Sequence, residues 1–134
     1  MMNESLSTIM ATKLYTVVPS DTLQKVRQIF SNHRIHHLPV LEGKKLVGIL
    51  TTHDLWHLNR LFEDYDDILV RDVMTRHLAT LNPDEKVGAA AEIFLENRFH
   101  AVPVVNEDFD LVGLITSFDI LRYAFKKEYP NQDI

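Results

Sequence analysis

The sequence predicts an α+β fold built from two similar units, because the chain contains an internal repeat. Residues 9–40 align without a gap on residues 73–104, and ten of the 32 aligned positions are identical. A further block aligns residues 46–54 with residues 111–119, and five of its nine positions are identical. In each copy, short apolar runs alternate with stretches of helical spacing, which is typical of mixed strands and helices. We expect two such copies to pack about a pseudo-twofold axis.

The first copy predicts an extended segment, a helix, a β-hairpin and a second helix. Short β-branched and apolar runs indicate the strands, and apolar residues three or four positions apart indicate the helices. The expected elements are a loose tail over residues 1–6, an extended segment over 14–18, a helix capped by Ser20 or Asp21, a hairpin of strands 38–41 and 46–50, and a helix from Thr52 whose apolar stripe reaches Leu61 and Phe62.

The second copy repeats this order after an acidic linker at residues 63–67. Gly88 lies inside the helical pattern, where it either allows close packing or has no role. The expected elements are an extended segment over 78–81, a helix with apolar residues from Val87 to Phe94, a hairpin of strands 102–105 and 111–115, and a last helix containing Ile120 and Leu121, with a frayed tail from Tyr129.

The bulk composition limits the classes of function. With 134 residues, 46% of them hydrophobic, the chain can form one compact domain or two halves that share a core. The absence of cysteine excludes disulfides and thiolate sites and fits a reducing compartment. No apolar run approaches the roughly 18 residues of a membrane-spanning helix, and residues 1–5 do not resemble a signal peptide, so we expect a cytoplasmic protein. The net charge of -5 disfavours nucleic-acid binding.

Each copy places a threonine at the end of a buried strand and an aspartate three residues later, as Thr51 with Asp54 and Thr116 with Asp119. One interpretation is a capping box, in which the hydroxyl caps the helix and the carboxylate returns to the N–H of the cap residue. The other is a ligand site, because a helix N-terminus attracts anions and a carboxylate accepts hydrogen bonds from paired hydroxyls such as those of ribose. The two interpretations are compatible, and both remain open.

The order of elements resembles the CBS domain, named after cystathionine β-synthase. The resemblance is carried by Ile9-Met10 and Val73-Met74-Thr75, by the strands at 38–40 and 102–104, and by the two Gly-x-x-Thr-x-x-Asp stretches. It covers nearly the whole chain as a stand-alone tandem pair, a Bateman module, with repeats at 7–62 and 71–127 and a linker at 63–70. The resemblance implies two β-α-β-β-α repeats with pseudo-twofold symmetry, and clefts between the repeats that bind adenosine-containing ligands.

The same resemblance implies a set of nucleotide-binding residues at equivalent places in the two repeats. Asp54 and Asp119 would hold ribose hydroxyls, and Thr51 and Thr116 would contact the ribose or a phosphate. Backbone groups and apolar side chains would border the adenine. The adenine-bordering residues would be Thr16, Val18, Leu38 and Pro39 for one site, and Thr80, Asn82, Val102 and Pro103 for the other.

Basic residues stand just before the first hairpin strand of each repeat. The run at residues 34–40 resembles the corresponding run in the regulatory gamma subunits of AMP-activated kinases, where basic residues face the phosphates. Ala101 stands opposite His37, so the second repeat is expected to bind phosphate less tightly or to favour a ligand with fewer charges. For Arg34 and Arg98, a solvated helix end near its negative pole is the alternative. The residues expected to face phosphate are His36, His37, Arg98 and His100.

The sequence therefore predicts a regulatory module that senses an adenine nucleotide, AMP before ADP or ATP, and controls an unidentified protein in trans. S-adenosylmethionine, NAD and guanine nucleotides remain open as ligands. We expect a homodimer, no cofactor, and no enzymatic activity because no catalytic constellation is evident. His53 and His57 share a helix face but have no third ligand, so no metal site is predicted. The alternative function is a protein–protein interaction or dimerisation module with empty clefts.

Overall fold

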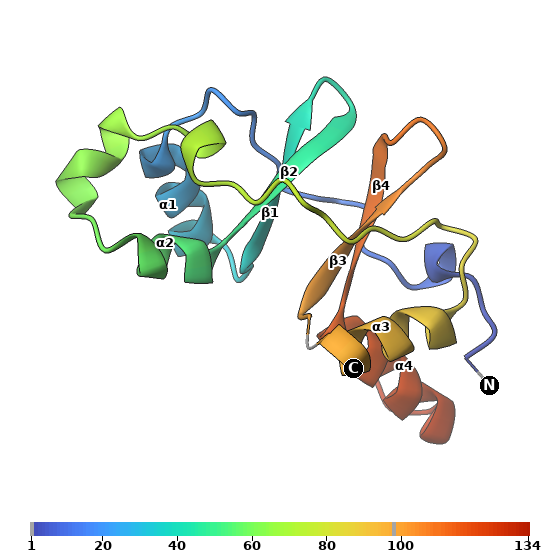
Figure 1. The fold of residues 1–134 in the computed structure, drawn as a ribbon. Coiled ribbons are helices and arrows are strands. Elements are labelled where there is room, and N and C mark those ends of the chain that lie inside the picture. The colour runs from blue at the N-terminus through green and yellow to red at the C-terminus, as the bar shows by residue number, and fades with distance from the viewer. Residues whose placement is uncertain (1, 98) are drawn as a thin grey trace. The chain divides into compact units, whose positions relative to one another are not determined.

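The computed structural model describes residues 2–97 and 99–134 and divides into two compact units (Figure 1). One unit is Tyr15–Leu78, and the other combines the chain up to Leu14 with Ala79–Ile134. Each unit contains a two-stranded antiparallel sheet and helices. The predicted α+β class and the repeated order of elements are therefore confirmed.

The unit at Tyr15–Leu78 is built around the hairpin β1 (His37–Glu42) and β2 (Lys45–Thr51). The helices α1 (Leu23–Asn32) and α2 (Thr52–Leu58) flank this hairpin in the chain, and the short 3-10 helices η2 (Phe62–Asp67) and η3 (Val70–Asp72) follow. Its core consists of the buried residues Val17, Leu23, Val26, Leu38, Val40, Leu50, Tyr65, Val70 and Met74.

The other unit begins with the 3-10 helix η1 (Leu6–Thr8) and continues with α3 (Val87–Asn97), β3 (Ala101–Val105), β4 (Leu111–Thr116) and α4 (Ser117–Glu128). Figure 1 shows α3 and α4 side by side at the base of the β3–β4 hairpin. The core consists of the buried residues Leu6, Leu81, Val87, Ala90, Phe94, Val102, Val104 and Ile115.

The extended segments predicted before α1 and α3 each lie along a hairpin. Val17 forms a parallel bridge with Val40, and Leu81 forms the equivalent bridge with Val104. The N–H of Val17 donates to the Pro39 carbonyl at 3.1 Å, and the N–H of Leu81 donates to the Pro103 carbonyl at 3.0 Å. These bonds place the residues that precede each helix next to the first strand of the hairpin.

The segment that opens each sequence repeat pairs with the hairpin of the other repeat. Ala11 exchanges two backbone hydrogen bonds with Leu114, at 2.9 and 3.0 Å. Thr75 exchanges two with Ile49, also at 2.9 and 3.0 Å. The compact units therefore group the chain differently from the sequence repeats expected at 7–62 and 71–127. The chain up to Leu14 lies in the unit that contains the second hairpin.

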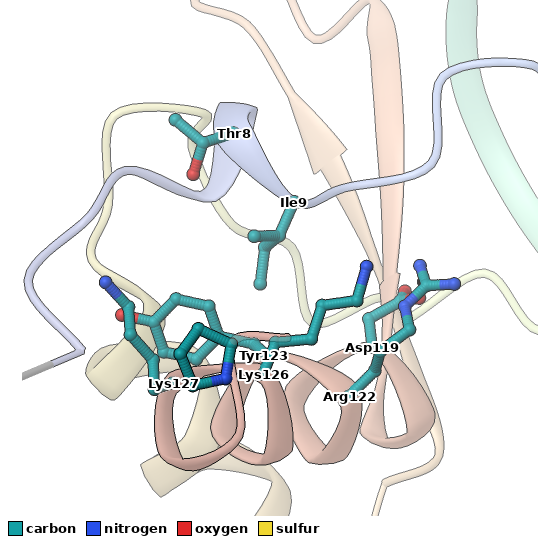
Figure 2. Close-up of a pocket in the computed structure, with 8 residues that line it drawn as sticks. Thr8, Ile9, Asp119, Arg122, Tyr123, Lys126 and Lys127 are labelled. Carbon is teal, nitrogen blue, oxygen red and sulfur yellow. Dashed lines mark ion pairs between the residues drawn. The ribbon is translucent and has the colours of Figure 1, made fainter. Parts of the chain in front are cut away.

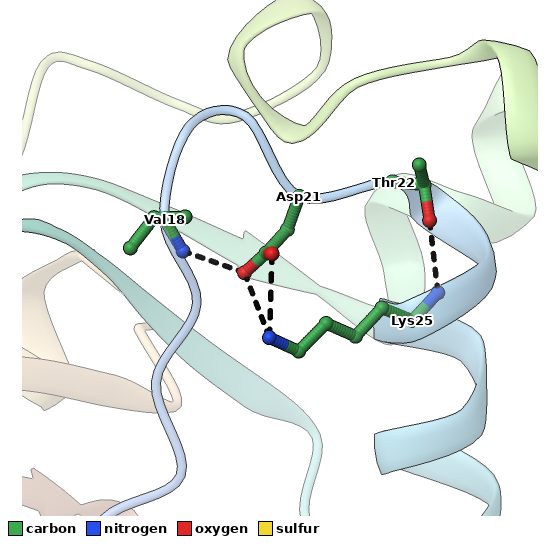
Figure 3. Close-up of polar contacts among 4 residues, drawn as sticks. All are labelled: Val18, Asp21, Thr22 and Lys25. Carbon is green, nitrogen blue, oxygen red and sulfur yellow. Dashed lines mark hydrogen bonds and ion pairs between the residues drawn. The ribbon is translucent and has the colours of Figure 1, made fainter.

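The cap of α1 differs from the prediction of Ser20 or Asp21. Thr22 is the N-cap, and its hydroxyl accepts a hydrogen bond from the N–H of Lys25 at 3.3 Å. The Asp21 carboxylate instead accepts from the N–H of Val18 at 2.8 Å and forms an ion pair with Lys25 Nζ at 3.3 Å (Figure 3). Asp21 closes the turn that leads into α1, and this turn leaves the capping position to the next residue.

The second helix of the first repeat is shorter than its apolar pattern predicts. It ends at Leu58, because Asn59 adopts a left-handed conformation with φ of 54°. Leu61 and Phe62 are therefore not part of this helix, and both side chains are exposed. The acidic stretch predicted as a linker forms η2, and Tyr65 within it is buried in the core.

Residues 2–6 are anchored, contrary to the loose tail predicted over 1–6, of which Met1 lies outside the described residues. The Leu6 side chain is fully buried, and its N–H donates to the Glu85 carbonyl at 2.8 Å. The N–H groups of Val87 and Gly88 at the start of α3 donate to the carbonyls of Glu4 and Met2, both at 2.9 Å. This segment therefore satisfies donors at the helix start that would otherwise lack a partner.

Candidate functional site

Two equivalent helix N-termini carry the threonine–aspartate pairs. At α2, Asp54 N–H donates to Thr51 Oγ1 at 3.0 Å and Thr51 N–H donates to Asp54 Oδ2 at 2.9 Å. At α4, the same two bonds between Thr116 and Asp119 measure 3.1 and 2.9 Å. Both pairs are complete capping boxes. The capping interpretation is therefore confirmed, and the same groups stay positioned at the helix ends for any ligand.

The capping boxes engage Oδ2 of each aspartate, so Oδ1 is the oxygen that a ligand hydroxyl would reach more easily. At the second site, Asp119 Oδ1 lies 3.7 Å from Arg122 Nη2. The Asp119 side chain is only 13% exposed, whereas that of Arg122 is 42% exposed. The residue at the equivalent position after Asp54 is His57. The two sites therefore share their caps but differ in charge one turn along the helix.

In the turns before α1 and α3, the backbone N–H groups of Val18 and Asn82 are already hydrogen-bonded. Val18 N–H donates to the Asp21 carboxylate at 2.8 Å, and Asn82 N–H donates to the Glu85 carboxylate at 2.9 Å. The Val18 side chain is exposed and that of Asn82 is partly buried. A purine could use these two N–H groups only if the turns opened. The partly buried residues Thr16 and Thr80 lie just before these turns.

The hairpin residues expected to border an adenine are buried. Leu38 and Val102 have exposed fractions of 0% and 1%, and each belongs to the core of its unit. Pro39 and Pro103 are also buried, and their carbonyls accept the bonds from Val17 and Leu81. In the described units these side chains hold the strands in place, and any role toward a ligand remains a prediction.

The histidines before the hairpins stand at the helix N-termini. The His36 carbonyl accepts from Thr52 N–H at 3.1 Å, and the His100 carbonyl accepts from Ser117 N–H at 3.1 Å. Both side chains are exposed, and His37 is partly buried. The backbone therefore places His36 beside the cap of α2 and His100 beside the cap of α4. Arg98 lies outside the described residues.

A cavity of about 660 Å³ lies between the N-terminal segment and α4 (Figure 2). Asp119 is the one predicted site residue in its lining, and the sequence reasoning missed the others. The available signal was a set of basic residues on α4 at positions where the first repeat has His57, Leu61 and Phe62. The lining consists of Thr8, Ile9, Asp119, Arg122, Tyr123, Lys126, Lys127 and Pro130.

Two lining residues of this cavity contact the N-terminal segment, because the Glu4 carboxylate accepts hydrogen bonds from Tyr123 Oη and Lys127 Nζ. The bond from Lys127, and then that from Tyr123, lowers the pKa of Glu4 from its ordinary value of 4.5 to about 2. The same contact with Glu4 raises the pKa values of Tyr123 and Lys127. Glu4 therefore ties the N-terminal segment to the last two turns of α4.

Within residues 2–97 and 99–134, no group of three or more histidine, aspartate or glutamate side chains is placed to hold a metal ion. None of the helices in this part of the chain is long and apolar enough to cross a membrane.

Comparison with known proteins places this geometry in a family. The family model described as the CBS domain matches residues 6–55 and 70–126. Among curated proteins, the chain is 33% identical over 115 residues to the inosine-5'-monophosphate dehydrogenase of Korarchaeum cryptofilum, covering 86% of this chain and 22% of that protein. The first relatives found are all much longer, since the chain spans less than half of their length.

Solved structures match over nearly the whole chain. The structure of CBSX2, a CBS-pair protein from Arabidopsis thaliana, in complex with AMP has a TM-score of 0.83 and 25% identity, covering 93% of this chain and 98% of that one. The CBS domain pair of MJ0100 in complex with 5'-methylthioadenosine and S-adenosyl-L-methionine has a TM-score of 0.81 and 28% identity, with the same coverage.

Proposed function

The chain belongs to the CBS-domain family, and we propose that it is a regulatory module that binds an adenine nucleotide and transmits the binding to a partner protein. The observation that carries this proposal is the pair of equivalent capping boxes, which hold Asp54 and Asp119 in one geometry at two helix ends. A carboxylate with an accessible oxygen accepts hydrogen bonds from both hydroxyls of a ribose. AMP and S-adenosyl-L-methionine, the ligands of the two structural relatives, both contain this ribose.

An adenine nucleotide is favoured over uncharged adenosine derivatives by the basic groups around the helix ends. His36 and His100 stand at equivalent positions next to the caps of α2 and α4. An imidazole ring can donate a hydrogen bond to a phosphate oxygen. A phosphate at this place would also lie at the positive end of the helix dipole. AMP is the first candidate ligand on this reasoning.

The proposed activity is binding without chemistry. Thr51 and Thr116 are committed to their caps, where each hydroxyl accepts a hydrogen bond from the N–H of its aspartate. The relatives that are enzymes, such as the dehydrogenase, match this chain over only 22% of their length. The ligand would act by differential affinity, since it shifts a conformational equilibrium only as far as it prefers one state.

The test is calorimetric titration of AMP, ATP and S-adenosylmethionine into the wild type, Asp54→Asn, Asp119→Asn and the double variant. Asparagine keeps an oxygen for the cap N–H and removes one acceptor for the ribose, so each helix stays capped. Hydrogen bonds to charged groups are worth roughly 1.5–3 kcal/mol, so each variant should weaken its own site about tenfold or more. Asp72→Asn, at an exposed site, is the control and should bind like the wild type. A folded protein that binds no adenosine compound would end the proposal.

A second candidate function, self-association, is favoured by exposed apolar side chains on α4. Phe118, Leu121 and Phe125 are spaced to share one helix face, with exposed fractions of 60%, 65% and 36%. Trp56, at the equivalent position to Leu121 on α2, is 77% exposed. Such residues are common at interfaces, so we propose a homodimer that uses these helices. Sedimentation analysis should show a dimer for the wild type and a monomer for Leu121→Glu, and a monomeric wild type would contradict the proposal.

A further inference from the structure

The cavity beside α4 is more basic than the chain around it. Its lining contributes three cations, Arg122, Lys126 and Lys127, against the single carboxylate of Asp119. The whole chain carries a net charge of -5, so positive charge is concentrated here against the overall balance. A hollow lined by one sign of charge raises the local concentration of ions of the opposite sign.

The three cations are not equally available to a ligand. Lys127 is held by the Glu4 carboxylate, and Arg122 lies 3.7 Å from Asp119. Lys126 has no carboxylate partner within ion-pair distance among the described residues. In Figure 2 its side chain runs along the floor of the cavity toward Arg122 and Asp119. One ammonium without an ion-pair partner among the described residues and one exposed guanidinium therefore share the cavity lining with the Asp119 carboxylate.

The two lysine positions are basic in the second repeat alone. Arg122, Lys126 and Lys127 align with His57, Leu61 and Phe62 of the first repeat. Lysines in the last turn of a helix also stabilise it through the helix dipole. That effect accounts for Lys126 and Lys127, but it does not account for Arg122 near the beginning of α4. The combination of all three around one hollow points to an anionic ligand.

We infer that this cavity is an anion subsite that receives the phosphate chain of a nucleotide whose ribose is held by Asp119, an inference that rests on the proposed function. Arg122 offers a planar fork of donors suited to phosphate oxygens, and Lys126 adds a point charge one turn further along. The second-repeat site should therefore favour ATP and ADP over AMP and adenosine. It should disfavour S-adenosylmethionine, whose sulfonium and ammonium groups are cationic. This reverses the expectation, based on Ala101, that the second repeat binds fewer phosphates.

The experiment follows the δ-methyl signal of Ile9, which lines the cavity, in a protein labelled at isoleucine methyl groups. ATP, AMP, adenosine and inorganic tripolyphosphate are titrated separately into the wild type, Lys126→Gln and Lys126→Arg. Lys44→Gln, in the exposed β1–β2 turn of the other unit, removes the same charge elsewhere and is the matched control.

ATP should bind at least about tenfold more tightly than adenosine at this site. A charge-assisted contact of this kind predicts that Lys126→Gln weakens ATP about five- to tenfold and leaves adenosine within about twofold. Lys126→Arg should retain most of the ATP affinity, and Lys44→Gln should change nothing. Raising the salt concentration should reduce the ATP advantage, because solvent-exposed charges are screened.

The outcomes separate this inference from the proposed function. Equal affinities for ATP and adenosine, unchanged by Lys126→Gln, would overturn the subsite and leave nucleotide binding intact. If no adenosine compound binds but tripolyphosphate shifts the Ile9 signal in a way that needs Lys126, the anion subsite stands and the nucleotide proposal fails. If neither adenosine compounds nor tripolyphosphate shift the signal, both are wrong.

Discussion

Replacing Gly113 with alanine should destabilise the unit that contains the second hairpin. A Cβ atom at this position would lie 2.5 Å from Sδ and 2.8 Å from Cγ of Met10. Optimal contacts between non-bonded heavy atoms are about 3.5–4.0 Å, so the new methyl group would be about 1 Å too close. Overpacking costs roughly 1–3 kcal/mol, and this substitution should lie near the low end of that range because the clashing atoms belong to the flexible Met10 side chain. Gly48 is the equivalent position, where the Cβ would meet Met74 Sδ at 2.6 Å and the Thr75 carbonyl oxygen at 3.1 Å.

Urea unfolding followed by circular dichroism measures this cost. The matched control is Gly88→Ala, because its Cβ would lie 3.4 Å from the nearest atom, the Met2 carbonyl oxygen, which is an ordinary contact. Gly88 is in α3, where alanine is favoured over glycine by up to about 1 kcal/mol. Gly88→Ala should therefore be neutral or stabilising, while Gly113→Ala lowers the free energy of unfolding.

A double-mutant cycle with Met10→Ala identifies the cause. Shortening Met10 removes the atoms that clash, so Gly113→Ala should cost markedly less in that background than in the wild type. A cost of Gly113→Ala that is the same with either residue at position 10 would refute the steric reasoning. So would a stability for Gly113→Ala equal to that of Gly88→Ala.

Two further predictions concern the cap of α4 and the contact of Glu4 with Tyr123 and Lys127. Thr116→Ala should lower the free energy of unfolding by about 1 kcal/mol in urea melts, because the Asp119 N–H loses its acceptor, whereas Thr116→Ser should stay near the wild type. The contact of Glu4 with Lys127 and Tyr123 depresses the pKa of Glu4 from 4.5 to about 2, so its stabilising contribution is complete above pH 4.5 and is lost as the pH falls from 4.5 toward 2. Melting temperatures measured across this window should fall less steeply for Glu4→Gln than for the wild type, and identical slopes would show that the contact does not form in solution.

Local patterns in the sequence were sufficient for the hairpins and for the caps of α2 and α4. Apolar runs on both sides of Gly43-Lys44 and the threonine–aspartate spacing are short-range signals. The structure forms the hairpin and the two caps that they predict. The cap of α1 was missed because three neighbouring residues, Ser20, Asp21 and Thr22, can all cap a helix. Only the turn that Asp21 makes with Val18 decides between them.

The long-range features could not be predicted in this way. Ala11 pairs with Leu114 and Thr75 with Ile49, at separations that no periodicity encodes. Leu61 and Phe62 continue a helical pattern, yet Asn59 ends the helix first by adopting a left-handed conformation. Tyr65 lies in an acidic stretch and is nevertheless buried, since the short helix around it turns one side chain into the core. The pairings of Ala11 and Thr75 and the burial of Tyr65 depend on packing against residues distant in sequence, whereas the helix end at Asn59 is a local feature of a residue that tolerates the left-handed conformation.

Several of the identities between the repeats have a role in stability whether or not a ligand binds. Met10 and Met74 pack against Gly113 and Gly48, and the threonine–aspartate pairs cap α2 and α4. A duplicated fold would need these residues in both copies even if it bound nothing. The positions that differ are therefore more informative about ligands, and Lys126 facing a cavity where the first repeat has Leu61 is the clearest of them. If the module senses nucleotides, the two sites should respond to different phosphate counts, and the ratio of ATP to AMP would then set which site is filled.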